Sequence, residues 1–221
     1  MNPQVLLGQV QATLKRLFTP PPMAIMPRYR AALEDLTIEV WVSQRKLPLA
    51  LRGGAIIVPT GPDLKMVFGV AKMVRDMGAD KAQKEASVVA PLAPGEAFVG
   101  TGSKYRYKYT ALAVIFDESK RTSPQLITSS VGKAMRMLRE RGVRSVIFPD
   151  MTENLLTQPN WITAEQRRET AAITARLMLA GIMDAGSNIK SVKIWVWDKA
   201  NADIFVDELK RFRQRERAVT A

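Results

Sequence analysis

The sequence has 221 residues and contains neither cysteine nor histidine. Without cysteine it can form no disulfide, no thiolate metal site and no cysteine nucleophile. Without histidine it lacks the usual general base and the commonest transition-metal ligand. Most familiar hydrolase mechanisms are therefore excluded, and we expect neither a bound metal nor a cofactor.

The sequence also lacks long hydrophobic runs. No stretch of about eighteen consecutive apolar residues occurs, and the segment from Met1 to Phe18 does not resemble a signal peptide. Hydrophobic residues nevertheless make up 47% of the chain, which is enough for one good core. These features predict a cytoplasmic protein with one main domain and no membrane partner.

Acidic residues are few relative to basic ones, and the formal net charge is +12. Clustered cations favour a polyanionic partner such as nucleic acid, although many small proteins are simply basic. Cations and tyrosines alternate in one segment, so a strand there would place them on opposite faces. That pattern fits an edge strand protected by charge better than a nucleic-acid platform. The cations are Lys104, Arg106 and Lys108, and the tyrosines are Tyr105, Tyr107 and Tyr109.

The first 36 residues are predicted to form a helical extension. Apolar residues recur at helical spacing from Gln4 to Phe18, and the prolines that follow Thr19 end that helix. A second short helical stretch is predicted at about Tyr29–Leu36. The main domain is then expected to span residues 37–217.

Strands and helices alternate in the rest of the chain, which predicts a mixed α/β sheet covered on both faces. Ser123 before Pro124 predicts a helix start, and Thr163 with Gln166 forms a capping box. Besides the tyrosine-rich segment, strands are predicted at about 38–42, 55–58, 97–100, 111–116, 145–148 and 192–197. Helices are predicted at about 66–77, 124–141, 163–180 and 202–217.

One segment suggests a ligand. Residues 54–71 contain a buried strand, a loop and a helix start, and Pro94-Gly95-Glu96-Ala97 follows some two dozen residues later. Backbone N–H groups at a helix N-terminus can hold a phosphate. The first hypothesis is therefore a nucleotide-like ligand.

These elements, taken in order, resemble the macro domain family from about Thr37 to Phe212. The resemblance rests on this strand, loop and helix, on Thr101-Gly102 after the Pro-Gly-Glu-Ala motif, and on three later strands. Those strands are Val114-Ile115-Phe116, Ser145 to Pro149 and the closing Val196-Trp197-Asp198. The resemblance implies a three-layer α/β/α fold that binds ADP-ribose or related nucleotides, and some members hydrolyse ADP-ribosyl bonds. A more remote relative, the N-terminal domain of leucine aminopeptidases, shares the fold without that role.

Carried over by position, the resemblance keeps only part of the family's site. Gln44 stands where an aspartate usually accepts from adenine, and its amide oxygen can still accept. Gly61 replaces the asparagine that reaches the distal ribose. Val67-Phe68-Gly69 replaces the glycine run near the diphosphate, so the bulk of Phe68 is expected to obstruct the distal-ribose space. Ala71 replaces the acidic residue of hydrolytic members.

The second phosphate loop and the final strand complete the comparison. The loop reads Asp150 to Leu156, and its carboxylates at Asp150 and Glu153 are expected to repel a diphosphate. Trp197 matches the aromatic residue that packs on adenine, although a core or rim tryptophan is an equally good interpretation. Candidate acids or bases near the cleft are Asp63, Asp150, Glu153 and Asp198, with Asp63 also fitting a simple turn.

The resulting prediction is a non-catalytic macro-like domain that binds ADP-ribose or a related nucleotide. The alternative is a degenerate macro fold that acts as a basic nucleic-acid-binding or assembly module. ADP-ribosyl hydrolase activity is the least supported, and no catalytic residue is assigned. The predicted ligand-binding residues are Gln44, Thr60, Gly61, Phe68, Gly69, Val70, Thr152, Glu153, Asn154 and Trp197.

Overall fold

A computed structural model describes residues 27–33, 35–43, 53–103, 106–151, 163–183, 188–197 and 199–219. The predicted N-terminal helix at 4–18 lies outside these residues. In the described part of the chain, no helix is both long and apolar enough to span a bilayer.

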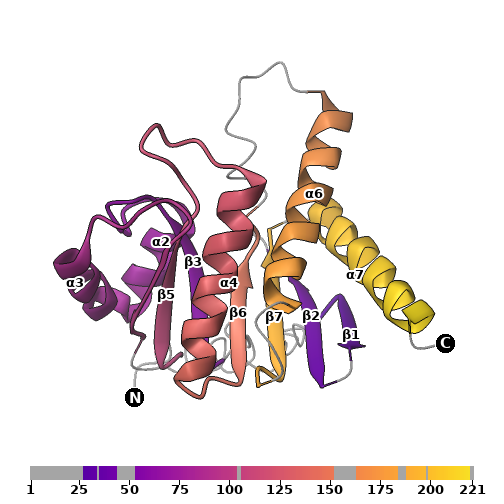
Figure 1. Ribbon diagram of the computed structural model, residues 1–221, viewed down its shortest axis with the longest axis horizontal. Coiled ribbons are helices and arrows are strands. Elements are labelled where there is room, and N and C mark those ends of the chain that lie inside the picture. The colour runs from indigo at the N-terminus through magenta and orange to yellow at the C-terminus, as the bar shows by residue number, and fades with distance from the viewer. Residues whose placement is uncertain are drawn as a thin grey trace, which may run out of the picture.

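The centre of the fold is a seven-stranded mixed sheet in the order β1-β2-β7-β6-β3-β5-β4 (Figure 1). The five inner strands run parallel, and an antiparallel strand closes each edge. The strands are β1 (Tyr29–Leu33), β2 (Leu36–Val42), β3 (Ala55–Thr60), β4 (Ala97–Thr101), β5 (Tyr109–Val114), β6 (Ser145–Pro149) and β7 (Ser191–Val196).

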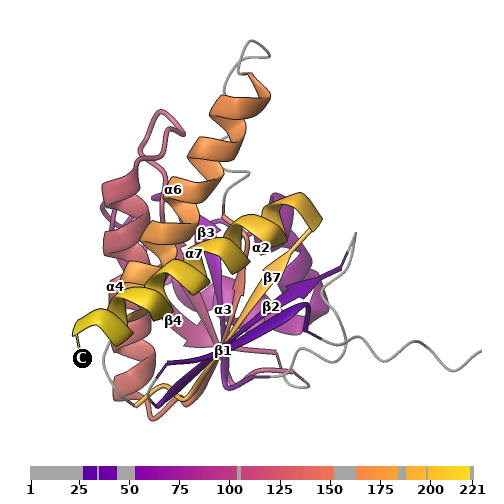
Figure 2. The ribbon, with the colours of Figure 1, turned by 90° about the vertical axis from the view of Figure 1, so that its right-hand side faces the viewer.

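Helices cover both faces of this sheet. One face carries α2 (Gly69–Val74), the π-helical turn η1 (Arg75–Ala79) and α3 (Asp80–Val89). The other face carries α4 (Pro124–Glu140), α6 (Ala164–Met183) and α7 (Lys199–Val219). Figure 2 shows the two helical layers on either side of the sheet. The predicted α/β fold with a mixed sheet is therefore confirmed.

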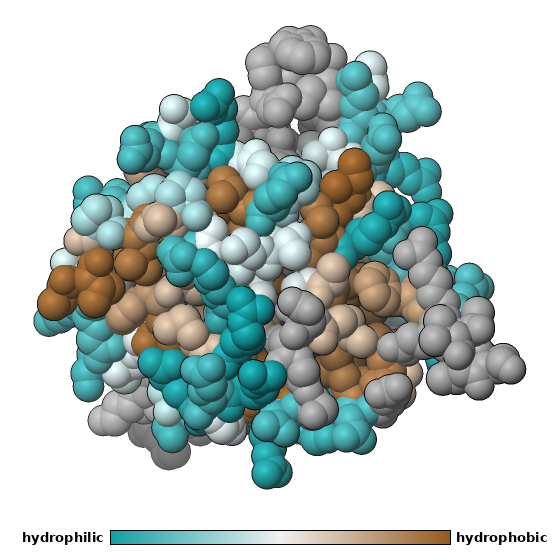
Figure 3. All heavy atoms as spheres, viewed as in Figure 1, coloured by the Kyte–Doolittle hydropathy of each residue, from teal (hydrophilic) through white to brown (hydrophobic). Residues whose placement is uncertain are grey.

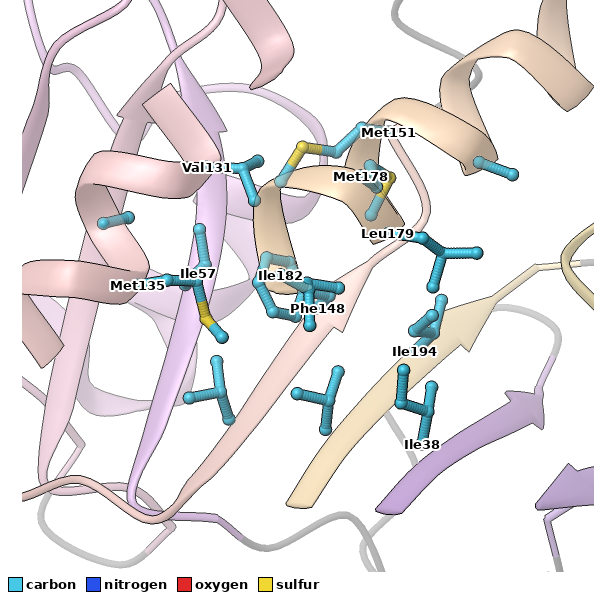
Figure 4. Close-up of a cluster of buried hydrophobic side chains, with 14 of the residues drawn as sticks. Ile38, Ile57, Val131, Met135, Phe148, Met151, Met178, Leu179, Ile182 and Ile194 are labelled. Atoms are coloured by element: carbon cyan, nitrogen blue, oxygen red, sulfur yellow. The ribbon is translucent and has the colours of Figure 1, made fainter. Parts of the chain in front are cut away.

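Successive residues of the inner strands supply two separate hydrophobic clusters. Along β3, Ile57 packs under α4 and α6, whereas Ile56 and Val58 pack under α2 and α3. This is the side-chain alternation of a strand buried on both faces. Figure 4 shows the larger cluster, where Phe148 and Ile194 of the sheet meet Leu179 and Ile182 of α6.

The predicted helical stretch at Tyr29–Leu36 is wrong. Residues 29–33 form β1, which pairs antiparallel with β2 and joins the same sheet. Ala31 and Leu33 are buried while Arg30 and Ala32 are exposed, so burial follows the two-residue period of a strand. A short apolar run fits either period, and tertiary pairing decides the outcome here.

The predicted helix at 66–77 begins later and does not end at Gly78. Leu64 and Met66 are buried in the loop that follows β3, and α2 begins only at Gly69. Gly78 has φ +104° and lies inside η1, where it introduces a kink between α2 and α3. A left-handed glycine marks a bend here and not a helix end.

Of the described residues of the tyrosine-rich segment, only the last, Tyr109, lies in a strand, because β5 begins there. Residues 106–108 form a loop that precedes β5, and the N–H of Gly102 donates to the carbonyl of Lys108 at 2.8 Å. The predicted strand faces of cations and tyrosines therefore do not form at Arg106–Lys108. Lys104 and Tyr105 lie outside the described residues.

Both predicted helix starts are confirmed. The Ser123 hydroxyl accepts from the N–H of Leu126 at 3.3 Å, and Pro124 is the first helical residue of α4. The N–H of Gln166 donates to the Thr163 hydroxyl at 3.2 Å, and the N–H of Thr163 donates to the Gln166 side chain at 2.9 Å. This reciprocal pair is a capping box at the start of α6.

Candidate functional site at the carboxyl edge of the sheet

The parallel strands β2, β3, β5, β6 and β7 all end at one edge of the sheet. Thr60 of β3 aligns with Val114 of β5, and Val42 of β2 aligns with Val196 of β7. Ligands of open α/β sheets bind outside the carboxyl ends of the strands. This carboxyl edge is therefore the first place to look for a site.

Thr60 and Gly61 form the turn that leaves β3. The Thr60 hydroxyl is directed into the sheet and donates to the carbonyl of Ala113 at 3.4 Å. The Thr60 carbonyl accepts from the N–H of Ile115 at 3.1 Å, and the N–H of Leu64 donates to the Gly61 carbonyl at 3.0 Å. Thr60 therefore holds the end of β3 against β5 through its hydrogen bonds. Gly61 follows it and contributes only backbone to the carboxyl edge.

Asp63, a candidate acid or base, is engaged within the same turn. Its carboxylate accepts from the N–H of Lys65 at 3.2 Å and pairs with the Lys65 ammonium at 3.4 Å. Both side chains are mostly exposed, so the ion pair contributes little to stability. The geometry is that of an aspartate turn, which is the simple structural interpretation of this residue.

The loop before α2 turns Phe68 outward. The N–H of Met66 donates to the side-chain oxygen of Gln83, and the amide of Gln83 donates to the carbonyl of Leu64. With Leu64 and Met66 anchored in the core, the Phe68 side chain is 78% exposed. The ring of Phe68 is therefore not packed into the core, and the expectation that it obstructs the distal-ribose space stays a prediction.

Gly69 and Val70 open the first turn of α2. Gly69 has φ +50°, which glycine adopts without strain, and an added Cβ would have no atom within 4 Å. The first backbone N–H groups of a helix have no acceptor within that helix. Apart from its two chain neighbours, no residue therefore crowds the backbone at Gly69, and an anionic group has room to approach it.

Trp197 lies directly after β7, beside the buried Trp195. The ring centroids are 5.0 Å apart and the ring planes are tilted by 36°. Trp195 is fixed through its indole N–H, which donates to the carbonyl of Ser43 at 3.2 Å. Trp197 is only partly buried, so its ring borders both the core and the carboxyl edge.

Asp150, at the end of β6, is not a free loop carboxylate. It is 3% exposed, its N–H donates to the carbonyl of Trp195 at 2.7 Å, and its carboxylate accepts from the Asn201 amide at 3.1 Å. The carboxylate ties β6 to the first turn of α7. The carboxylate of Asp150 does not face solvent, so it is not placed to repel a diphosphate as the sequence analysis expected.

The remaining sequence candidates fall outside the described residues. These are Gln44, Thr152, Glu153 and Asn154 among the predicted ligand-binding positions, and Asp198 among the carboxylates. Within the part of the chain that the structure describes, no group of three acidic residues could hold a metal ion.

Comparison with known proteins identifies this arrangement. The family model for the macro domain matches residues 59–166, which include the Thr60 turn, α2 and β6. The chain contains a macro domain. No curated protein matches the sequence significantly.

Solved macrodomains share the fold at low sequence identity. The Oceanobacillus iheyensis macrodomain with ADP is 15% identical with a TM-score of 0.66, and the match covers 85% of this chain and 97% of that one. The Trypanosoma brucei macrodomain in complex with ADP is 11% identical with a TM-score of 0.61, covering 78% and 68%. The macro domain of ganglioside induced differentiation associated protein 2 is 14% identical with a TM-score of 0.60, covering 78% and 83%.

A cavity of about 490 Å³ lies at the opposite edge of the macro domain, where β3 and β5 begin and β4 ends. We call it the amino-edge cavity. It is lined by Gly53, Gly54, Thr101, Gly102, Ser103, Arg106, Tyr107 and Lys108. Sequence reasoning missed this cavity because it depends on the loop closure between Gly102 and Lys108. The only local signal was the concentration of cations in this segment.

Tyr107 in the wall of this cavity gives the macro domain an alkaline pH dependence. Burial raises the pKa of the Tyr107 phenol to about 12, against a smaller lowering by Arg106. The unfolded chain releases this proton near pH 10, so the stabilisation is complete below pH 10 and is lost as the pH rises to 12. The loss amounts to about 3 kcal/mol, since each pKa unit is worth roughly 1.4 kcal/mol.

Tyr107→Phe is expected to remove this dependence. The buried hydroxyl has no hydrogen-bond partner, so its removal leaves the free energy of unfolding unchanged or higher at pH 8. Urea denaturation of both proteins between pH 8 and pH 12 measures the difference. Parallel stability profiles for the two proteins would contradict the assignment to Tyr107.

Proposed function

We propose that this macro domain binds ADP-ribose or a related nucleotide at its carboxyl edge. The supporting observation is that the residues matched by the macro family model surround an edge where Gly69 offers open backbone and Trp197 a partly exposed ring. ADP is present in macrodomain structures with the same fold.

In this proposal each part of the ligand meets a different element. The adenine lies between Gln44, whose amide oxygen accepts from the adenine amino group, and the ring of Trp197. Aromatic stacking suits this role because every base has a π face. The phosphates lie against the backbone N–H groups of Gly69 and Val70, which need no side chain to recognise an anion.

The proposed role is binding without hydrolysis. Asp63 is held by Lys65 in its own turn, and Ala71 occupies the position where hydrolytic members carry an acidic residue. A neutral methyl group cannot orient or deprotonate a water molecule. Release of ADP-ribose from a modified protein, abolished by Asp63→Ala, would overturn this part of the proposal.

Titration with ADP-ribose, followed by calorimetry, tests the binding. Trp197→Ala is expected to raise the Kd by about 5- to 150-fold, since stacking contributes roughly 1 to 3 kcal/mol per base. Trp197→Phe keeps an aromatic face and serves as the matched control, with a Kd within a few-fold of the parent. Absence of heat at millimolar ADP-ribose with a folded protein would refute the function. Equal Kd values for Trp197→Ala and the parent would refute the adenine position.

A further inference from the structure

A cation stands directly before three of the parallel strands. Lys190 precedes β7, Arg144 precedes β6 and Lys108 precedes β5, and all three residues are exposed. Parallel strands begin at the same edge of a sheet, so these residues lie along the edge opposite the candidate site (Figure 1). We call this edge the amino edge and the three residues the cation row.

The register of the strands brings the cation row to nearly one level. Ser145 of β6 pairs with Ser191 of β7, so Arg144 and Lys190 are level with each other. Through β3, Lys108 lies within one residue of the same level. The strands β7, β6, β3 and β5 are neighbours in that order. Neighbouring strands are about 4.8 Å apart, so the row extends over about 14 Å.

Backbone hydrogen bonds hold the cation row in place. The carbonyl of Arg144 accepts from the N–H of Lys190 at 2.9 Å and from that of Ser191 at 3.0 Å. The N–H of Lys108 donates to the carbonyl of Gly54 at 3.0 Å. The sheet therefore sets the spacing of the three charges before any partner binds, which lowers the cost of binding.

The charge of the cation row is largely available to a partner. Lys108 and Arg144 form no ion pair within the part of the chain that the structure describes. Lys190 pairs with Asp35 at 2.6 Å, but the Asp35 side chain is 75% exposed. Exposed ion pairs are weak, so a phosphate group can compete for Lys190.

The end of α4 adds two further cations beside the row. Arg139 lies in the last turn of α4 and Arg141 follows its last residue, Glu140, which is the acidic residue of this turn. Cations suit the C-terminus of a helix, which accounts for Arg139 and Arg141 without a partner. Strands carry only small dipoles, so the cations that precede β5, β6 and β7 are not explained in this way.

We propose that the cation row binds the phosphate backbone of duplex nucleic acid, irrespective of its sequence. A duplex carries one negative charge per about 1.7 Å of its axis, so several phosphates face a row of about 14 Å. Each cation that meets a phosphate releases counterions, and this release drives binding. Single strands are held largely by stacking on aromatic rings, and no exposed ring lies at the amino edge among the described residues.

Fluorescence anisotropy with a labelled short DNA duplex of mixed sequence, over a series of salt concentrations, tests the proposal. The double variant Lys108→Gln with Arg144→Gln is expected to bind at least tenfold more weakly at low salt. The slope of log K against log salt is expected to become shallower by about 1.8, since each phosphate contact contributes about 0.9. Both substitutions change exposed side chains, so the midpoint of unfolding is expected to stay that of the parent.

The matched control is Lys84→Gln with Arg213→Gln, which also removes one lysine and one arginine. Both residues are exposed, on α3 and α7, and neither forms an ion pair with a described residue. The control is expected to bind the duplex within twofold of the parent, and the row variant is expected to bind ADP-ribose like the parent. This second measurement separates the row from the carboxyl edge, so either site can fail without the other.

Three results would overturn the proposal. Equal weakening by the row variant and the control would mean that only the net charge matters. Tighter binding of the single strand than of the duplex would exclude a duplex site. Binding of an acidic polypeptide that depends on Lys108 and Arg144, with no salt-dependent binding of the duplex, would identify a protein partner.

Discussion

Gly102→Ala is expected to destabilise the protein by more than about 4 kcal/mol, an effect at the extreme of single substitutions. A Cβ at this position would lie 2.3 Å from the carbonyl oxygen of Tyr107 and 2.7 Å from the backbone nitrogen of Tyr109. Because both neighbours are backbone atoms, no side-chain rotation relieves the overlap. The chain must give up the hydrogen bond between Gly102 and Lys108 and the adjoining pairing of β4 with β5.

Guanidinium denaturation measures this loss, and Gly132→Ala provides the opposite case. Gly132 lies within α4, and the nearest atoms to an added Cβ there are 3.5 and 3.9 Å away. Alanine fits that space and raises helix propensity, so we expect a gain of up to about 1 kcal/mol. Similar unfolding midpoints for Gly102→Ala and the parent would show that the backbone of residues 107–109 does not lie against Gly102.

Phe148→Ala is expected to destabilise the protein by about 3 to 5 kcal/mol, as aromatic truncations in cores do. Phe148 is fully buried in β6, between the sheet and Ile182 of α6 (Figure 4). Pro149 and Asp150 follow Phe148 at the end of β6, so the cavity that the substitution leaves lies next to the carboxyl edge. We therefore expect weaker ADP-ribose binding as well as a lower midpoint of unfolding.

The control for this substitution is the same change at an exposed position. Phe68 is 78% exposed, so Phe68→Ala is expected to alter the free energy of unfolding by no more than about 0.5 kcal/mol. Phe68 is not the only exposed hydrophobic residue that the structure describes, since Val88 and Val89 of α3 are exposed too. Figure 3 shows hydrophobic atoms on the surface at the α3 end of the molecule. A large loss of stability in Phe68→Ala would mean that its ring packs against the protein in solution.

The later part of the fold was predictable because its signals are local. Contacts between residues three apart determine where two helices begin. Ser123 caps α4 ahead of Pro124, and Thr163 pairs with Gln166 at the start of α6. Buried β-branched runs predicted β3 and β6 for a similar reason. These segments need little information from distant parts of the chain.

Errors arose where distant contacts decide the structure. Tyr29–Leu33 forms a strand because β2 offers an edge for it, and Leu64 and Met66 leave the helical pattern because Gln83 of α3 binds their backbone. Both outcomes depend on tertiary contacts, which override weak local preferences.

The candidate site was predictable in its frame and less so in its detail. Trp197, Gly69 and Thr60 follow the carboxyl ends of β7 and β3 or form them, as expected of residues that the resemblance assigned to one site. The outward Phe68 and the buried Asp150 could not be foreseen, because each follows from an anchor on another element. The nucleic-acid alternative stays a prediction, and binding that weakens steeply with salt would support it.

The position of β2 in the sheet bears on how the chain folds during synthesis. The inner neighbour of β2 is β7, and the contact between Trp195 and Ser43 joins residues 152 positions apart in the sequence. Until the ribosome releases residues 191–196, β2 has only β1 beside it and presents an unpaired, largely hydrophobic strand edge. Such late closure favours slow folding and exposes the nascent chain to aggregation. Shortening the protein before β7 would make this exposure permanent, so chaperones are expected to bind the truncated chain.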